Sequence, residues 1–188
     1  MVHTESDIVF HAYAKTNRSI RLDSIERMTQ LLAELENVQW DIILISESRT
    51  PSGMYRLDGG HVLYTVLMDD DFLGTGILLN AKHAKSSNTV HNLSSRVLGL
   101  DFCVNGMKIR AVSVYVPYCG YIGVDVFDET YDRLRYLCAA GRKQRRRLLI
   151  GGDFNSQVGV GERGECMDEF VRSFGLVLAN SSDTPWND

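Results

Sequence analysis

Short, almost wholly apolar runs alternate along this chain with segments of helical periodicity. The clearest run covers residues 40–46 and contains a single charged residue, Asp41. A strand this apolar suits a sheet that is covered on both faces. Over residues 22–35, apolar side chains recur at three- and four-residue steps, which predicts an amphipathic helix. We therefore expect sheets with helices packed outside them.

The remaining elements continue the same alternation. Asn105-Gly106 joins two apolar runs and is a strong hairpin signal. A second hairpin is expected over residues 54–67, turning at Gly59-Gly60. The other expected strands are 8–13, 74–80, 97–104, 108–116, 148–150 and 176–178, and the other expected helices are 125–140 and 165–173. Strands outnumber helices, which predicts an α/β fold of mixed sheets in a layered sandwich.

Composition excludes several classes of protein. The 188 residues are 44% hydrophobic and carry a net charge of −4, which excludes a disordered chain and a broadly basic nucleic-acid binder. The polar N-terminus lacks a signal-peptide pattern, and no apolar run is long enough to span a bilayer. The chain has four widely spaced cysteines, Cys103, Cys119, Cys138 and Cys166, which argues against structural zinc. We expect an intracellular protein with reduced thiols, nuclear or cytoplasmic and not secreted.

Two expected strands end in side chains that can bind a metal ion or a phosphate. Glu47 directly follows the run over residues 42–46, and its carboxylate offers the hard oxygen that Mg²⁺ prefers. The alternative is a strand-end glutamate that turns into solvent. Tyr115 ends an apolar strand just before Pro117, where its hydroxyl can bond a phosphate oxygen or the side chain can simply belong to the core.

A third strand end carries Asp153 and Asn155 after the glycine pair Gly151-Gly152. Glycines allow a sharp turn or a close backbone approach. If the backbone stays extended, Asp153 and Asn155 share one face and can orient a water molecule, with the carboxylate as its base. The alternative is an Asp-x-Asn turn with self-capping side chains. The end of the first strand offers a further amide ligand, Asn17.

Three motifs, in this order and at these spacings, resemble those of the endonuclease–exonuclease–phosphatase superfamily. They are residues 41–49 (DIILISESR), residues 113–117 (SVYVP) and residues 152–155 (GDFN). Residues 74–80 and 95–97 are similar to the intervening segments in endonuclease domains of non-LTR, LINE-type retrotransposons. The resemblance covers nearly the whole chain. It implies a DNase I-like, four-layer α/β sandwich of two mixed β-sheets flanked by helices.

The resemblance also implies a function and its cofactor. It indicates a Mg²⁺-dependent phosphodiesterase, with Mn²⁺ as a substitute ion, and most specifically an endonuclease that nicks target DNA for a retrotransposon. Its partners would be DNA and, in a parent polyprotein, a reverse transcriptase. Glu47 would bind the metal ion together with Asn17. Asp153 would activate the attacking water. The residues implied to contact the substrate are Tyr115, Asn155 and Arg96.

One motif of the superfamily has no match. Members close with a Ser-Asp-His segment, whereas none of the five histidines here follows Asp153. We therefore expect residues 1–188 to be a single domain truncated before its final strand and that motif. A missing catalytic histidine costs orders of magnitude in rate, which predicts weak or no activity for this fragment.

Three alternatives stay open. A phosphatase or lipid phosphodiesterase of the same superfamily would carry the same metal-site motifs. A non-catalytic nucleic-acid-binding relic would use the basic run over residues 142–147, although cations there also suit a helix end. Residues 159–164 fit GxGxxG, but the strand that a dinucleotide fingerprint needs directly before it is absent from the pattern.

Overall fold

The computed structural model describes residues 10–13, 25–68, 73–84, 88–118 and 124–179. The chain divides into two compact units, residues 1–154 and 155–188. The first unit contains two β-sheets with helices α1 (Ile25–Leu35) and α2 (Val124–Lys143). The second contains helix α3 (Gly161–Ser173). The assignment of residues 1–188 to a single domain stays a prediction.

The first sheet has five strands in the order β1-β2-β5-β4-β3. Strand β1 runs parallel to β2, and the other neighbours are antiparallel. The β3–β4 pair is the hairpin predicted over residues 54–67, which is thereby confirmed. The strands are β1 (Phe10–Tyr13), β2 (Ile42–Ser46), β3 (Gly53–Arg56), β4 (Val62–Val66) and β5 (Thr75–Leu79).

The second sheet has four strands in the order β6-β7-β8-β9. Strands β7 and β8 form the hairpin predicted at Asn105-Gly106, whose φ angles of 49° and 81° are the left-handed values that a two-residue turn requires. Strands β8 and β9 are parallel, and α2 makes the crossover between them. The strands are β6 (Thr89–Ser94), β7 (Val97–Val104), β8 (Met107–Tyr115) and β9 (Arg147–Asp153).

The two sheets pack face to face around one hydrophobic core. Ile42 and Leu44 of β2 join Leu98 and Phe102 of β7 in this cluster of buried side chains. Ile43 lies between the two β2 residues in sequence and belongs to a second cluster. Alternate residues of a strand point to opposite faces, so β2 is buried on both sides, as its continuous apolar run predicted.

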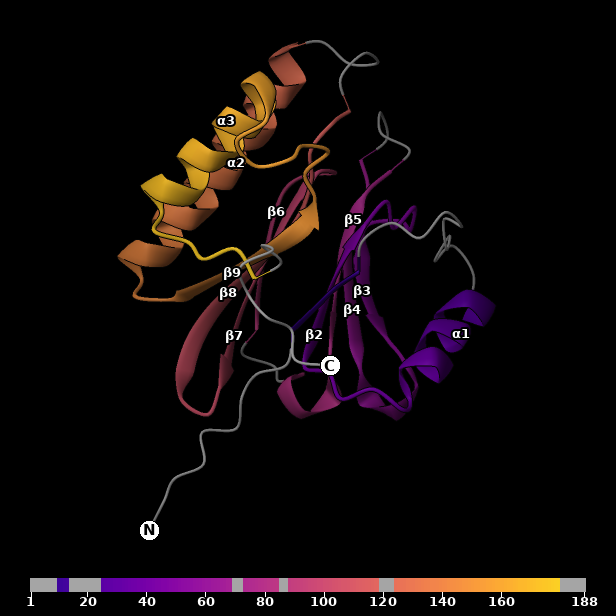
Figure 1. The fold of residues 1–188 in the computed structure, drawn as a ribbon. Coiled ribbons are helices and arrows are strands. Elements are labelled where there is room, and N and C mark those ends of the chain that lie inside the picture. Colours follow the sequence, from indigo (N-terminus) through magenta and orange to yellow (C-terminus); the bar gives the residue numbers. More distant parts are fainter. Residues whose placement is uncertain (1–9, 14–24, 69–72, 85–87, 119–123, 180–188) are drawn as a thin grey trace. The chain divides into compact units, whose positions relative to one another are not determined.

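A helix covers the outer face of each sheet, as Figure 1 shows. Leu31 of α1 packs on the first sheet with Ile43. On the second sheet, the Arg110 guanidinium of β8 donates from Nη1 to the backbone oxygen of Leu137 in α2 (2.9 Å). The layers are therefore helix, sheet, sheet and helix, which confirms the predicted four-layer sandwich of two mixed β-sheets.

A buried ion-pair network fixes α2 and the turn after it to the second sheet. Arg110 donates two hydrogen bonds to the Asp101 carboxylate, from Nε to Oδ1 (2.7 Å) and from Nη2 to Oδ2 (2.8 Å). Burial alone would raise the pKa of Asp101, but hydrogen bonds from Arg110 and His91 outweigh it and hold that pKa below its usual value. Arg146 from the basic run also pairs with Asp101 (3.0 Å), so part of that run serves the fold.

One predicted strand is wrong and one strand was missed. Residues 176–178 form no strand, because the chain there closes α3: the N–H groups of Gly175 and Leu176 donate to the carbonyls of Arg172 and Val171. These bonds form a Schellman motif, with Gly175 left-handed at φ 46°. Strand β6 was missed because it is a mostly exposed edge strand, T-V-H-N-L-S, without an apolar run.

Two further features bear on the expected cellular setting. No disulfide joins Cys103, Cys138 and Cys166, which are the cysteines that the structure describes. Burial raises the pKa of the Cys138 thiol to about 12, so this thiol stays protonated near neutral pH. Within the described ranges, no helix is long and apolar enough to cross a membrane.

Candidate active site

The carboxyl ends of β2, β8 and β9 meet at one edge of the sandwich. The Ser46 hydroxyl, at the end of β2, donates to the backbone oxygen of Val114 (3.1 Å) and accepts from the backbone N–H of Asp153 (2.9 Å). In the opposite direction, the Ser113 hydroxyl of β8 donates to the backbone oxygen of Ile45 in β2 (3.0 Å). These bonds tie the end of a strand in the first sheet to two strands of the second.

The glycine before Asp153 allows this close approach. Gly152 has a φ of 140°, and a Cβ atom there would lie 1.9 Å from the backbone oxygen of Val114. A side chain at this position is therefore excluded. The backbone N–H of Val116 in turn donates to the carbonyl of Asp153 (2.8 Å), and Asp153 is the register partner of Tyr115.

A strained turn positions Glu47. Glu47 and Arg49 both have left-handed backbones, with φ angles of 56° and 51°, and such residues cost about 1–3 kcal/mol each. The segment that enters β5 holds the turn in place: the N–H of Arg49 donates to the carbonyl of Leu73 (2.8 Å), and Gly74 accepts from Ser48 (3.2 Å). As a result the Glu47 side chain is only 14% exposed, so it does not turn freely into solvent.

Tyr115 lies at the centre of the charged groups. Burial raises the pKa of its hydroxyl, and the carboxylates of Glu47 and Asp153 raise that pKa further, whereas the Arg96 guanidinium opposes them. The nearby Glu47 carboxylate is the stronger of these two negative charges in its effect on the hydroxyl. The guanidinium carbon of Arg96 lies 5.2 Å from the centroid of the Tyr115 ring, within the range of a cation–π contact. The phenol thus remains a neutral donor near neutral pH.

The structure brings four of the predicted site residues together, namely Glu47, Arg96, Tyr115 and Asp153. Asn17 lies outside the described residues. Strand β9 ends at Asp153, and Asn155 has a left-handed φ of 46°. The extended backbone assumed for Asp153 and Asn155 therefore stops before Asn155, which belongs to the second compact unit. The role of Asn155 stays a prediction.

Two residues of the site were missed in the sequence. Ser46 was part of a recognised motif, but nothing in the pattern indicated that its hydroxyl would join three strand ends. Arg49 lies two residues after Glu47, and its Nη2 atom is 3.7 Å from Glu47 Oε2. That contact requires left-handed backbones at Glu47 and at Arg49, on either side of Ser48. The sequence holds no local signal for this conformation.

The donor set fits a divalent cation that keeps water or substrate ligands. Within the described ranges, no group of three or more His, Cys, Asp or Glu side chains could form a complete protein cage. The ends of strands β2 and β9, which carry Glu47 and Asp153, are nevertheless joined by the bond from the backbone N–H of Asp153 to the Ser46 hydroxyl. Mg²⁺ is typically held by one or two carboxylates, with waters and phosphate oxygens completing its shell. The residues present therefore suit Mg²⁺ or Mn²⁺ beside a phosphate.

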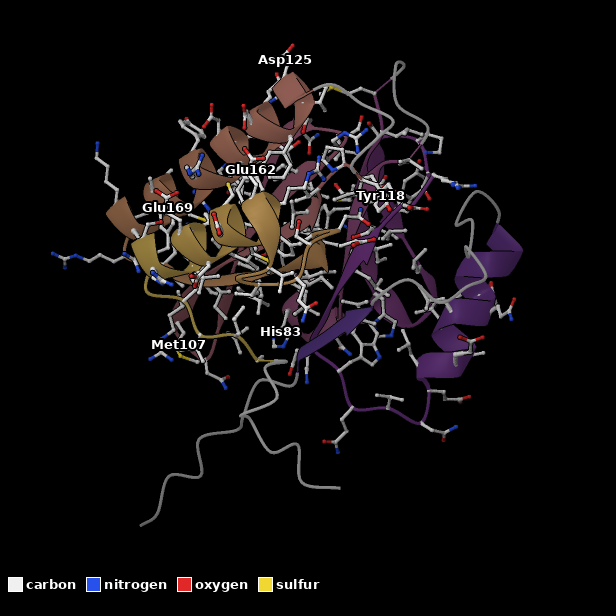
Figure 2. All side chains as sticks on the ribbon, turned by 45° about the horizontal axis from the view of Figure 1, so that its top comes forward. His83, Met107, Tyr118, Asp125, Glu162 and Glu169 are labelled. Atoms are coloured by element: carbon white, nitrogen blue, oxygen red, sulfur yellow. The ribbon has the colours of Figure 1, made fainter. Side chains whose placement is uncertain are left out.

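A second ionisable cluster lies at the other end of the first sheet. Asp41 Oδ1 is 2.6 Å from His83 Nε2 and 2.7 Å from Lys82 Nζ. Asp41 precedes β2, whereas Glu47 follows it. Tyr118 follows the end of β8 in the chain, and Figure 2 shows His83 well apart from Tyr118. The Asp41 cluster is therefore separate from the candidate site.

Comparison with known proteins supports the fold. No protein-family model matches the chain, and no curated protein matches it. Among solved structures, it is similar to the endonuclease domain of TRAS1, a telomere-specific non-LTR retrotransposon, with a TM-score of 0.58 and 17% identity over 94% of this chain and 74% of that one.

Two other solved structures are similar. The AP endonuclease LMAP from Leishmania major has a TM-score of 0.51 and 13% identity, over 82% of this chain and 64% of its own. SmcL has a TM-score of 0.51 and 12% identity, over 94% of this chain and 71% of the SmcL chain. At these identities the likeness concerns the fold, and the predicted DNase I-like α/β sandwich is confirmed.

Proposed function

We propose that this chain carries a Mg²⁺-dependent phosphodiesterase site that cleaves DNA, and that its most specific role is to nick target DNA for a LINE-type retrotransposon. The observation that carries the proposal is the meeting of three strand ends: the Ser46 hydroxyl, next to Glu47, accepts from the backbone N–H of Asp153 (2.9 Å), and Tyr115 is the register partner of Asp153. Carboxylates suit a divalent cation, and a hydroxyl and a guanidinium suit a phosphate. The fold shared with the TRAS1 endonuclease domain supports DNA as the substrate.

Each residue of the cluster has a distinct task in this proposal. When bound, a divalent cation would polarise the phosphoryl oxygen and neutralise charge on the leaving oxygen. Glu47 would hold that ion. Tyr115, kept protonated by its raised pKa, donates a hydrogen bond to a phosphate oxygen, and Arg96 adds positive charge beside it. Asp153 takes the proton from the attacking water.

The resemblance gives Asn155 a role in holding the attacking water and the phosphate, and gives Asn17 a role as a further metal ligand. It is also compatible with a parent polyprotein that contains a reverse transcriptase. These three points rest on the motifs alone, so the design of the activity test does not depend on them.

A plasmid-nicking assay tests the proposal. The protein should include whatever its gene encodes downstream of Asp188, and supercoiled plasmid should be incubated with Mg²⁺ or with EDTA. We expect nicked circles with Mg²⁺ alone, and a rate at least about a hundredfold lower for Asp153→Ala, because general-base catalysis contributes that much or more. Asp125→Ala, at an exposed carboxylate in the first turn of α2, is the matched control.

The assay has two outcomes against the proposal. Equal nicking by the wild type and Asp153→Ala would remove Asp153 from the chemistry. Release of inorganic phosphate from a monoester, with no nicking under the same conditions, would favour a phosphatase of the same fold instead.

A further inference from the structure

Arg49 has unused hydrogen-bonding capacity beside the proposed metal ligand. Its Nη2 atom is 3.7 Å from Glu47 Oε2, beyond a normal hydrogen bond, and its side chain is 29% exposed. Its Nε atom is buried and has no hydrogen-bond partner within the described part of the chain. A guanidinium carries five N–H donors. The Arg49 guanidinium is therefore a charged group that is partly exposed to solvent and only loosely paired with Glu47.

Arg110 shows how a structural arginine in this chain differs. Its Nε, Nη1 and Nη2 atoms donate to Asp101 and to the backbone oxygen of Leu137 at 2.7–2.9 Å, and the residue is 1% exposed. Among the residues that the structure describes, Arg49 makes no comparable set of side-chain bonds, although its backbone N–H donates to Leu73 and its conformation is left-handed. Strain of this kind persists where the surrounding structure fixes a position.

The charges around Glu47 compete with one another. Glu47 is the partner of Arg49 in the structure, and the same carboxylate is the proposed ligand of a divalent cation. A cation there would weaken the attraction between Glu47 and Arg49 and would repel the guanidinium. A phosphodiester beside the cation would give Arg49 a new anion, and a guanidinium binds phosphate through two parallel N–H bonds.

We propose that Arg49 couples the binding of the divalent cation to the binding of the phosphodiester. Without substrate, Arg49 is the counter-ion of Glu47 and opposes cation binding. With both present, Arg49 turns from Glu47 to a phosphate oxygen and favours the ternary complex. This inference rests on the proposed function, since it takes Glu47 as a metal ligand, and it adds a residue that contacts the substrate.

Two binding measurements with Arg49→Gln test the coupling through affinities rather than through a reaction rate. Mn²⁺ binding, followed by electron paramagnetic resonance without DNA, should become tighter by roughly two- to fivefold, as expected for loss of a partly exposed ion pair. Binding of a short fluorescein-labelled DNA duplex in Mg²⁺, followed by anisotropy on intact duplex, should weaken by about tenfold. Effects of opposite sign on the two ligands do not arise from a damaged fold.

The control is Arg56→Gln. Arg56 is an exposed arginine in β3 of the same sheet. Its register partner Val62 pairs with Leu79, at one end of β5. The residue next to Glu47, Ser46, pairs with Thr75 at the other end of β5. Arg56→Gln removes the same charge far from the site and should change neither affinity. Arg49→Lys keeps the charge without the guanidinium fork, so Mn²⁺ affinity should stay near the wild-type value while DNA binding weakens.

The outcomes separate this inference from the proposed function. Mn²⁺ affinity that is unchanged or lower in Arg49→Gln, with normal binding by the wild type, would overturn the coupling alone. The same holds if Arg49→Lys binds DNA as tightly as the wild type. Absence of any Mn²⁺ site in the wild-type chain would overturn the proposed function, and the coupling with it.

Discussion

At the scale of single residues, the carboxylates of Glu47 and Asp153 both affect the hydroxyl of Tyr115. Tyr115 is only 7% exposed, and its hydroxyl lies in the field of the Glu47 carboxylate and of the Asp153 carboxylate. All three influences disfavour the phenolate. A tyrosine in this setting is a hydrogen-bond donor over the whole neutral range, which is what contact with a phosphate oxygen requires.

The raised pKa of Tyr115 predicts a pH-dependent stability. Because the pKa in the folded state lies above the ordinary value of 10.0, the contribution of the protonated hydroxyl is fully present below about pH 10 and is lost as the pH rises through the folded-state pKa. Tyr115→Phe lacks this group, and near neutral pH it should be less stable by about 1 kcal/mol, because it loses the favourable interaction of the protonated hydroxyl with the nearby Glu47 carboxylate.

Urea unfolding of the wild type and Tyr115→Phe between pH 8 and about pH 11 measures this effect. The difference in unfolding free energy should be constant at the lower pH values and shrink above pH 10. A difference that does not change across the whole series would contradict the environment described for Tyr115.

Some of the site could be predicted from the sequence, and the reason is local. Glu47, Tyr115 and Asp153 each end an apolar strand, and the motifs around them indicated both their positions and a shared site. The contact between Arg49 and Glu47 could not be predicted, because the left-handed turn depends on residues 73–74, which are distant in sequence. The conformation at Asn155 was left open between an extended continuation of the strand and an Asp-x-Asn turn, and its φ of 46° excludes the extended backbone.

At the scale of secondary-structure elements, the site depends on how the strand ends are joined. The Ser46 hydroxyl satisfies the carbonyl of Val114 and the N–H of Asp153 together. Removal of this hydroxyl leaves both partly buried backbone groups without that partner, which costs about 1–3 kcal/mol. It also frees the end of β9, and with it the carboxylate of Asp153.

Ser46→Ala is therefore expected to lower both stability and metal affinity. Ser52→Ala is a matched control, because the Ser52 hydroxyl makes the same kind of two-way bridge, with the carbonyl and N–H of Leu67 (2.8 Å each), at an exposed position. Thermal unfolding and Mn²⁺ titration of both variants should show a clear loss for Ser46→Ala alone. Equal effects from the two substitutions would argue against a special joint at Ser46.

The elements that the sequence predicted well are those with one dominant physical signal. Strand β2 is buried on both faces and is continuously apolar, and α1 shows a regular helical period. Strand β6 is an edge strand with polar side chains, so its only signal is its pairing with β7, which is not local. Residues 176–178 look like a strand by composition, yet Leu176 completes the cap of α3.

At the scale of the whole molecule, a net charge of −4 does not by itself attract the DNA backbone. The basic run over residues 142–147, which begins in the last turn of α2, is not available as a block, because Arg146 pairs with the buried Asp101. In the proposed function the missing positive charge at the phosphate comes from the divalent cation, with Arg96 and Arg49 beside it. Binding of DNA should accordingly require the cation.

The most direct test of the central claim is whether Glu47 and Asp153 serve one cation. Mn²⁺ binding to the 188-residue chain should be titrated by electron paramagnetic resonance for the wild type, Glu47→Gln, Asp153→Asn and the exposed control Asp125→Asn. We predict one Mn²⁺ site that weakens at least about tenfold in both site variants and is unchanged in the control. Wild-type affinity in both Glu47→Gln and Asp153→Asn would contradict the account.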